Sequence, residues 1–151
     1  KSQNIGCVRM SERHFSSIPP RHEEVEKAIA DIDEAIRGAA DVVPIRDAVT
    51  LIAVAGTATT VAAAALELDS YDRYAIHLAH ISREKTHEIS EKFLAMSRDE
   101  IASLAYMHPG RVDVIAAGSL VLSRILKISN ASEFVASESD ILDGMAWSLA
   151  N

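Results

Sequence analysis

The hydrophobic positions of the first half of the chain follow two different patterns. From residue 25 to residue 36, aliphatic side chains recur at intervals of three and four residues among Glu, Asp and Lys. This spacing predicts an amphipathic helix of about five turns with an acidic, solvated face. Val49–Ala55 is an almost continuously apolar run with β-branched residues, which predicts a strand buried on both faces. Thr59–Leu68 is small and apolar on nearly every side, which predicts a closely packed helix.

Shorter patterns predict further elements on either side of these segments. Asn4–Met10 is interpreted as a first strand, and a short extended piece is expected within Ile76–Ile81. Ser82 is a candidate N-cap for a helix that runs to about Ala95. Ser97–Glu100 has the pattern of a capping box that opens another short helix.

The last third of the chain predicts two helices and one strand. A long, mostly apolar helix is expected to begin at Pro109 or Gly110. Glu133–Ser137 is interpreted as a short strand, and Ser137 or Ser139 is expected to cap a final helix. The order of strands and helices therefore predicts an α/β fold with a mixed sheet and flanking helices.

Length and charge limit the classes of function. The chain has 151 residues, which suits a single domain, and its 15 Lys and Arg against 22 Asp and Glu give a net charge of −7. An acidic chain is a poor candidate for binding nucleic acid or a membrane surface, because both require a basic field. The longest apolar stretch, Val114–Leu122, is far shorter than the ~20 residues that span a bilayer. We therefore expect neither nucleic acid nor a membrane among the partners.

The chain holds a single cysteine. Cys7 alone excludes an internal disulfide and a Cys-rich zinc site, and it favours a reducing, cytoplasmic location. The sequence begins with Lys1 rather than Met, and no signal peptide follows. From this beginning we expect the chain to be a piece of a longer protein.

The segment around Gly56 is the first candidate site. Gly56 and Thr57 follow the strand predicted at Val49–Ala55, and Thr59 and Thr60 lie at the start of the next helix. Ligands of α/β proteins bind at the carboxyl ends of strands, and a helix N-terminus offers free N–H groups to anions. The segment matches neither a Walker A loop nor G-x-G-x-x-G. Two interpretations stay open: a turn that faces a ligand, or a tight turn in which glycine is needed sterically.

Arg111 is the second candidate. The pattern places it in the first turn of the long apolar helix, where the helix dipole disfavours a cation. Contact with a phosphate or a fixed carboxylate would explain this position of Arg111. The alternative, for Arg111 and for Asp113, is a local ion pair. Arg9 and Arg13 are interpreted as solvated surface charges rather than phosphate ligands. The histidines at positions 77, 80 and 87 do not form a recognisable metal site, so we expect no metal ligand in this chain.

Two of these segments together resemble the exopolyphosphatase/guanosine pentaphosphate phosphohydrolase family. They are Val54–Ala62 (Val-Ala-Gly-Thr-Ala-Thr-Thr-Val-Ala) and Met107–Val121, which begins Met-His-Pro-Gly-Arg-Val-Asp. The pattern Arg-x-Asp-x-Ile-x-x-Gly in Arg111–Gly118 is the specific part of the resemblance. The opening and closing segments are also similar to the family, so the resemblance extends over nearly the whole chain.

The resemblance implies an actin-like ATPase (ribonuclease H-like) domain. Members of the family have two such domains, with the active site in the cleft between them. They hydrolyse the terminal phosphoanhydride of inorganic polyphosphate, of guanosine pentaphosphate, or of both, usually with Mg²⁺. Residues 1–151 would be the C-terminal part of the second domain, incomplete at its N-terminal hairpin. The candidate substrate- and phosphate-binding residues are then Gly56, Thr57, Thr59 and Arg111, and Gly118 would serve packing.

Parts of the family's machinery have no match in this sequence. The family's Asp-x-Gly phosphate loops and its catalytic glutamate are expected upstream of Lys1, together with the ligands of Mg²⁺. The chain would then supply one wall of the cleft, contain no catalytic residue, and be nearly inactive alone. A missing hairpin would leave a sheet edge open, which predicts a homodimer. The alternatives are a non-catalytic module that binds polyphosphate or (p)ppGpp, and half of a sugar kinase, which Arg111–Gly118 disfavours.

Overall fold

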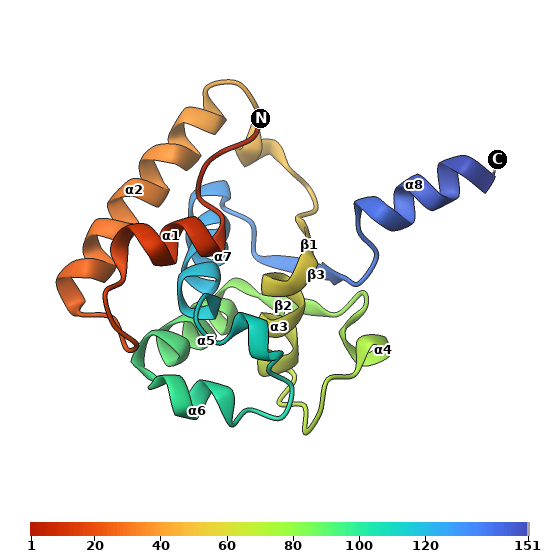
Figure 1. The fold of residues 1–151 in the computed structure, drawn as a ribbon. Coiled ribbons are helices and arrows are strands. Elements are labelled where there is room, and N and C mark those ends of the chain that lie inside the picture. Colours follow the sequence, from red (N-terminus) through yellow and green to blue (C-terminus); the bar gives the residue numbers. More distant parts are fainter. Residues whose placement is uncertain (151) are drawn as a thin grey trace.

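The structure, a computed structural model, describes residues 1–150 and is built around a three-stranded sheet with helices packed about it (Figure 1). The strands are β1 (Ile52–Val54), β2 (His80–Ser82) and β3 (Glu133–Ser137). β3 is central: β1 pairs with it in parallel and β2 antiparallel. The predicted α/β fold with a mixed sheet is therefore confirmed. Val54 lies beside Ser137 in the parallel pair, so both strands end at the same edge of the sheet.

The central helix is α7 (Ile115–Ser129). It packs against four other helices: α1 (Cys7–His14), α2 (His22–Ala40), α3 (Ala55–Ala65) and α5 (Arg83–Ala95). The remaining elements are α4 (Arg73–Ile76), α6 (Arg98–Ala102), α8 (Ile141–Ala150) and the short 3₁₀ turns η1 (Ile45–Asp47) and η2 (Pro109–Arg111). None of the helices within residues 1–150 is both long enough and apolar enough to cross a bilayer.

α2 forms as its hydrophobic spacing predicts. Ile32 and Ile36 are buried, whereas Glu23, Glu26 and Glu34 are exposed. The Glu24 carboxylate holds the start of the helix, since it accepts hydrogen bonds from the Ser16 hydroxyl at 2.6 Å and from the Arg21 backbone N–H at 2.9 Å. Hydrogen bonds from Ser16 and then from Arg21 lower the pKa of Glu24 to about 2.

The predicted first strand is wrong. Asn4–Met10 is not extended, because helix α1 begins at Cys7. Cys7 is therefore a partly exposed helix residue rather than a buried strand residue. The alternation was short, and packing decided the outcome: α1 lies across α7 and buries Met10 completely.

β1 is shorter and more exposed than predicted. The strand covers Ile52–Val54 rather than Val49–Ala55, and Ile52 and Val54 are 63% and 50% exposed. The reason is its place at the edge of the sheet, since nothing in the described part of the chain pairs with its outer side.

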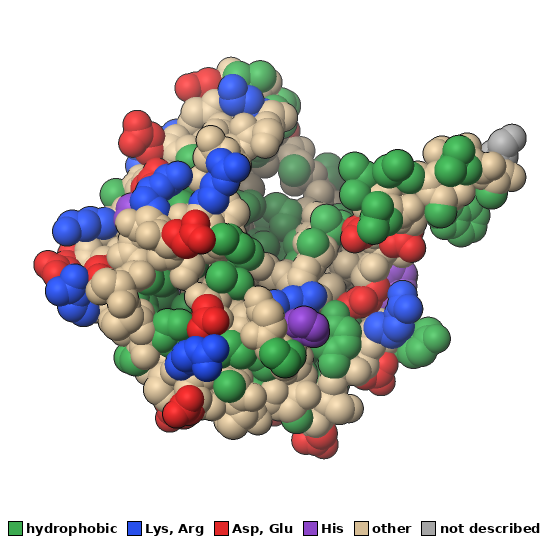
Figure 2. All heavy atoms as spheres, in the orientation of Figure 1, with side chains coloured by type: hydrophobic (Ala, Val, Ile, Leu, Met, Phe, Trp, Pro, Cys, Tyr) green, Lys and Arg blue, Asp and Glu red, His purple; other side chains and the backbone are tan. Residues whose placement is uncertain are grey.

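Figure 2 shows further hydrophobic side chains along α8, which projects away from the rest of the molecule.

Two predicted helix starts are confirmed and a third is not. The Ser82 hydroxyl caps α5, and Ser97 and Glu100 form the capping box of α6. The long apolar helix begins later than expected: Pro109–Arg111 forms the separate turn η2, and α7 starts only at Ile115. Arg111 therefore precedes the helix and does not lie in its first turn.

The cap of the last helix also differs from the prediction. The carboxylate of Asp140 accepts a hydrogen bond from the backbone N–H of Leu142 at 2.8 Å. Ser137 and Ser139 instead bond to each other, because the Ser137 hydroxyl donates to the Ser139 carbonyl oxygen at 2.8 Å. An Asp immediately before the helix thus performs the role that the pattern assigned to a serine.

Candidate anion-binding site

The turn from β1 into α3 places a helix N-terminus at the edge of the sheet. Val54 is the last strand residue and Ala55 the first helix residue, so the chain reverses without a connecting loop. Ala55 adopts a left-handed backbone conformation with φ of 67°, which an alanine rarely occupies. The first N–H groups of α3 have no partner within the helix, and they carry the positive end of its dipole.

Gly56 and Arg111 come into direct contact at this turn. A Cβ atom on Gly56 would overlap the Nε, Cζ and Nη2 atoms of Arg111. Gly56 itself has an ordinary, negative φ, so this position requires glycine for the approach of the guanidinium and not for the turn. Arg111 is held there by a hydrogen bond of 2.9 Å from its Nη1 to the hydroxyl of Thr60, which is fully buried.

Thr57 and Thr59 have different surroundings. Thr57 lies against Gly118 of α7, where a Cβ atom on that glycine would come within 2.7 Å of the Thr57 hydroxyl oxygen. Gly118 is thus a packing glycine, as expected. Thr59 is buried, and its hydroxyl donates to the Gly56 carbonyl oxygen at 3.4 Å. Thr57 lines the cavity beside the turn, whereas Thr59 lies behind it.

The cavity beside this turn measures about 340 Å³ and lies between α1, the end of β1, the start of α3 and η2. Gly56, Thr57 and Arg111 line it, and Arg111 is the one charged residue among the described residues that do so. No carboxylate within residues 1–150 lies at ion-pair distance from Arg111. An uncompensated guanidinium and a helix N-terminus at one cavity produce a local field that attracts an anion.

Tyr71 and Glu138 adjoin the site, and the sequence did not single out Tyr71. The Tyr71 hydroxyl donates to the Glu138 carboxylate at 2.5 Å, although the two residues are 67 positions apart. Burial and this hydrogen bond raise the pKa of Tyr71, while hydrogen bonding with Thr59 and Arg111 acts in the opposite direction. Glu138 follows β3, at the sheet edge where the Gly56 turn also lies. Glu138 directly follows a parallel strand, and ligands of α/β proteins bind at the carboxyl ends of such strands. This position could have identified Glu138 as a candidate from the sequence.

The remaining sequence candidates stay outside this site. Asp113 forms an ion pair with Arg98 at 2.7 Å, which is the local interpretation that the sequence left open. Arg9 bonds to the Asn4 side chain and Arg13 to Asp31, both at 2.6 Å. No group of three or more His, Cys, Asp or Glu side chains among the described residues is arranged to hold a metal ion.

Comparison with known proteins identifies the family to which this chain belongs. The Ppx/GppA phosphatase family matches residues 1–151, and the chain belongs to this family. It is 39% identical, over 99% of its length, to "Exopolyphosphatase 2" of Mycobacterium tuberculosis, of which it covers 48%. It is also 30% identical, over 95% of its length, to the "Bifunctional 3-dehydroquinate synthase/phosphatase" of Fusobacterium nucleatum, of which it covers 21%.

Solved structures agree with this assignment. The chain superposes on the crystal structure of an exopolyphosphatase-like protein with a TM-score of 0.96 at 38% identity, over 99% of this chain and 49% of that one. The Ppx/GppA enzyme of Aquifex aeolicus shares the fold, with a TM-score of 0.88 at 23% identity over 98% of this chain and 48% of that one. The chain thus has an actin-like α/β fold and spans about half the length of the exopolyphosphatases that it matches.

Proposed function

We propose that this chain forms one wall of the phosphate-binding site of an exopolyphosphatase-type hydrolase, which releases terminal phosphate from inorganic polyphosphate, from guanosine pentaphosphate, or from both. The observation that carries the proposal is the placement of Arg111. Its guanidinium lies on Gly56 at the N-terminus of α3, lines a cavity, and has no carboxylate partner within residues 1–150. Membership of the Ppx/GppA phosphatase family supports the choice of a phosphoanhydride as ligand.

The geometry supports a distinct role for each of these residues. The Arg111 guanidinium and the free N–H groups of α3 bind phosphate oxygens, and the lack of a side chain at Gly56 lets both reach the same oxygens. Thr57 adds a hydroxyl at the cavity wall, and Thr59 supports the turn through the Gly56 carbonyl oxygen. These donors hold the substrate and neutralise charge that builds up as phosphate leaves.

The Mg²⁺ that the family resemblance implies does not fit the residues described here. None of the residues that line the cavity is acidic, and the described residues form no cluster of metal ligands. We therefore assign it no ligand in this chain and derive no step of the reaction from it. The work assigned to residues 1–150 is to bind and orient phosphate.

Phosphate release from polyphosphate tests this proposal. The wild-type gene product at its full genomic length is compared with its Arg111→Ala variant and with an Arg98→Ala control. The control removes the same charge at an exposed arginine that pairs with Asp113. We expect the Arg111 variant to lose at least tenfold in kcat/KM, because a charge-assisted hydrogen bond is worth about 1.5–3 kcal/mol, and the Arg98 variant to be unchanged. Full activity of the Arg111 variant would refute the proposed role.

The same comparison separates hydrolysis from sensing. The cavity is lined by cationic and neutral hydrogen-bond donors but by no acidic side chain among the described residues. These residues can therefore bind an anion, but none of them is a carboxylate that could activate water. Arg111-dependent binding of tripolyphosphate without phosphate release, in the full gene product, would favour the alternative of a non-catalytic module that binds polyphosphate or (p)ppGpp. Release that depends on Arg111 would favour the hydrolase.

A further inference from the structure

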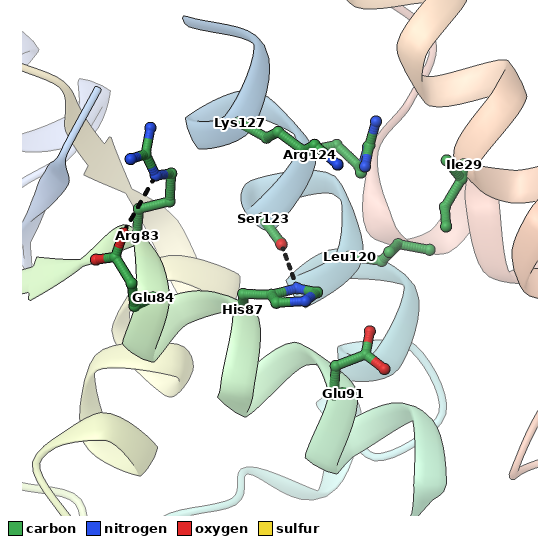
Figure 3. A pocket seen from close by; sticks show the side chains of 9 residues that line it. All are labelled: Ile29, Arg83, Glu84, His87, Glu91, Leu120, Ser123, Arg124 and Lys127. Carbon is green, nitrogen blue, oxygen red and sulfur yellow. Dashed lines mark hydrogen bonds and ion pairs between the residues drawn. The ribbon is translucent and has the colours of Figure 1, made fainter. Parts of the chain in front are cut away.

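Two adjoining hollows form a second candidate site away from Arg111. They measure about 370 and 460 Å³ and lie among α2, α5, α7 and η1. Arg124 and Lys127 of α7 line both hollows, so the two lie next to each other, and together they are called the groove. Figure 3 shows the first hollow, with these two side chains above the His87–Ser123 pair. The groove shares no lining residue with the cavity at Arg111.

A bidentate ion pair between α7 and α2 lies where the two hollows meet. Arg124 binds Asp33 of α2 with both arms of its guanidinium, with Nε to Oδ1 at 2.7 Å. Both side chains are largely buried, at 16% and 15% exposure. This pair fixes α7 to α2 and satisfies the charge of Arg124, so the cations that remain for a ligand are the neighbouring ones.

One half of the groove is cationic. Arg37 of α2, Arg46 of η1 and Lys127 of α7 line it, and Asp33 is its acidic residue. None of the three cations has a carboxylate at ion-pair distance within residues 1–150, and Asp33 is engaged by Arg124. The dipoles of α2 and α7 favour a cation in their last turns, but they do not explain why three elements direct cations to one hollow. In a chain of net charge −7, this convergence of cations is suited to binding an anion.

The other half of the groove has a different character. Its walls include the aliphatic side chains of Ile29 and Leu120. Besides Arg124 and Lys127, its polar groups are the His87 ring, the Ser123 hydroxyl, the Glu91 carboxylate and the Arg83–Glu84 ion pair at 3.4 Å. Figure 3 shows Leu120 and Ile29 on one side of the His87 ring and Glu91 on the same helix as His87. The carboxylates of Glu84 and Glu91 disfavour a second phosphate here, and the aliphatic wall beside the His87 ring suits a flat heterocycle.

We propose that this groove binds a nucleoside di- or triphosphate. Arg37, Arg46 and Lys127 hold the phosphates, and the base lies against Leu120 and His87. A uniform polyanion fits worse, because its charge would extend into the half that holds the acidic side chains of Glu84 and Glu91. The proposal does not depend on the function proposed for Arg111, since the two sites share no residue.

Calorimetric titration of the full gene product with ADP and GDP tests the proposal. We expect binding of at least one nucleotide, weakened about tenfold by Lys127→Ala and by Arg46→Ala, because each substitution removes one charge-assisted contact to phosphate. Lys92→Ala, an exposed lysine on α5 outside the groove, is the matched control and is expected to bind normally. Arg111→Ala is likewise expected to leave the affinity unchanged. Pyrophosphate, which lacks a base, is expected to bind at least tenfold more weakly than the nucleotide.

Several results would overturn this proposal. The absence of binding of ADP and GDP at millimolar concentration would do so, as would equal affinity for pyrophosphate or a single-stranded oligonucleotide. Loss of nucleotide binding in the Arg111 variant, with normal binding in the Lys127 variant, would move the nucleotide to the first site. Lys127→Gln, which keeps the length of the side chain, provides a second variant if the alanine variant does not fold, and it is expected to show the same loss.

Discussion

Replacing Gly56 by alanine would place a methyl group where the Arg111 guanidinium now lies. The guanidinium is the far end of a flexible side chain, so it can move away without a shift of the backbone. That movement breaks the hydrogen bond of 2.9 Å to the buried Thr60 hydroxyl. The variant should therefore fold, while Arg111 no longer lies at the N-terminus of α3.

The magnitude of the Gly56→Ala effect follows from these contacts. Loss of the bond to Thr60 costs about 1–2 kcal/mol of folding free energy, and alanine in a helix recovers about 0.5–1 kcal/mol relative to glycine. We expect a net destabilisation between about 0 and 1.5 kcal/mol. Phosphate binding loses a charged contact worth about 1.5–3 kcal/mol, so the affinity for tripolyphosphate should fall at least tenfold.

Gly38→Ala is the matched control for this experiment. Gly38 lies in α2, and nothing lies within 4 Å of a Cβ atom added there. That variant should be about 0.5–1 kcal/mol more stable and should bind tripolyphosphate normally. Calorimetric titration gives the affinities, and urea unfolding gives the stabilities. Unchanged affinity in the Gly56 variant would refute the argument that the Arg111 guanidinium at this position binds phosphate.

Three further predictions concern packing, pH and assembly. Gly118→Ala should lower the free energy of unfolding by about 1–3 kcal/mol in urea titrations, because the new methyl group would overlap Thr57 in a closely packed contact. The pKa of Glu24 is lowered to about 2, so its contribution to stability is present above the unfolded-state pKa and is lost as the pH falls toward 2. Glu24→Gln should therefore be less stable than wild type at pH 7, with a difference that shrinks below about pH 4.5; a constant difference across that window would contradict this. Because β1 has an unpaired edge within the described residues, light scattering of residues 1–151 on their own should report the predicted homodimer. Ile52→Lys should dissociate it, and a monomer at high concentration would count against it.

Parts of the fold could be predicted because their signals are local. The acidic helix α2 and the small-residue helix α3 follow from spacing and composition over ten or more residues, although α3 covers Ala55–Ala65 rather than the predicted Thr59–Leu68. β3 was predicted with its observed bounds. Asn4–Met10 failed because seven residues of weak alternation do not outweigh burial of Met10 against α7. β1 is exposed because it lies at the edge of the sheet. Which strand lies at an edge depends on how the strands pair, and the residues of β1 do not encode that pairing.

The sequence by itself determined the candidate groups of the first site: the Gly-Thr turn after a strand, and Arg111, which it placed in the first turn of a long apolar helix. Only the tertiary structure decided that Arg111 lies on Gly56, that Thr59 is buried behind the turn, and that Tyr71 bonds to Glu138. It also decided that cations from three separate elements line one groove. The physical reason is that periodicity and capping act over a few neighbouring residues, whereas contacts between distant residues form only when the helices pack around α7.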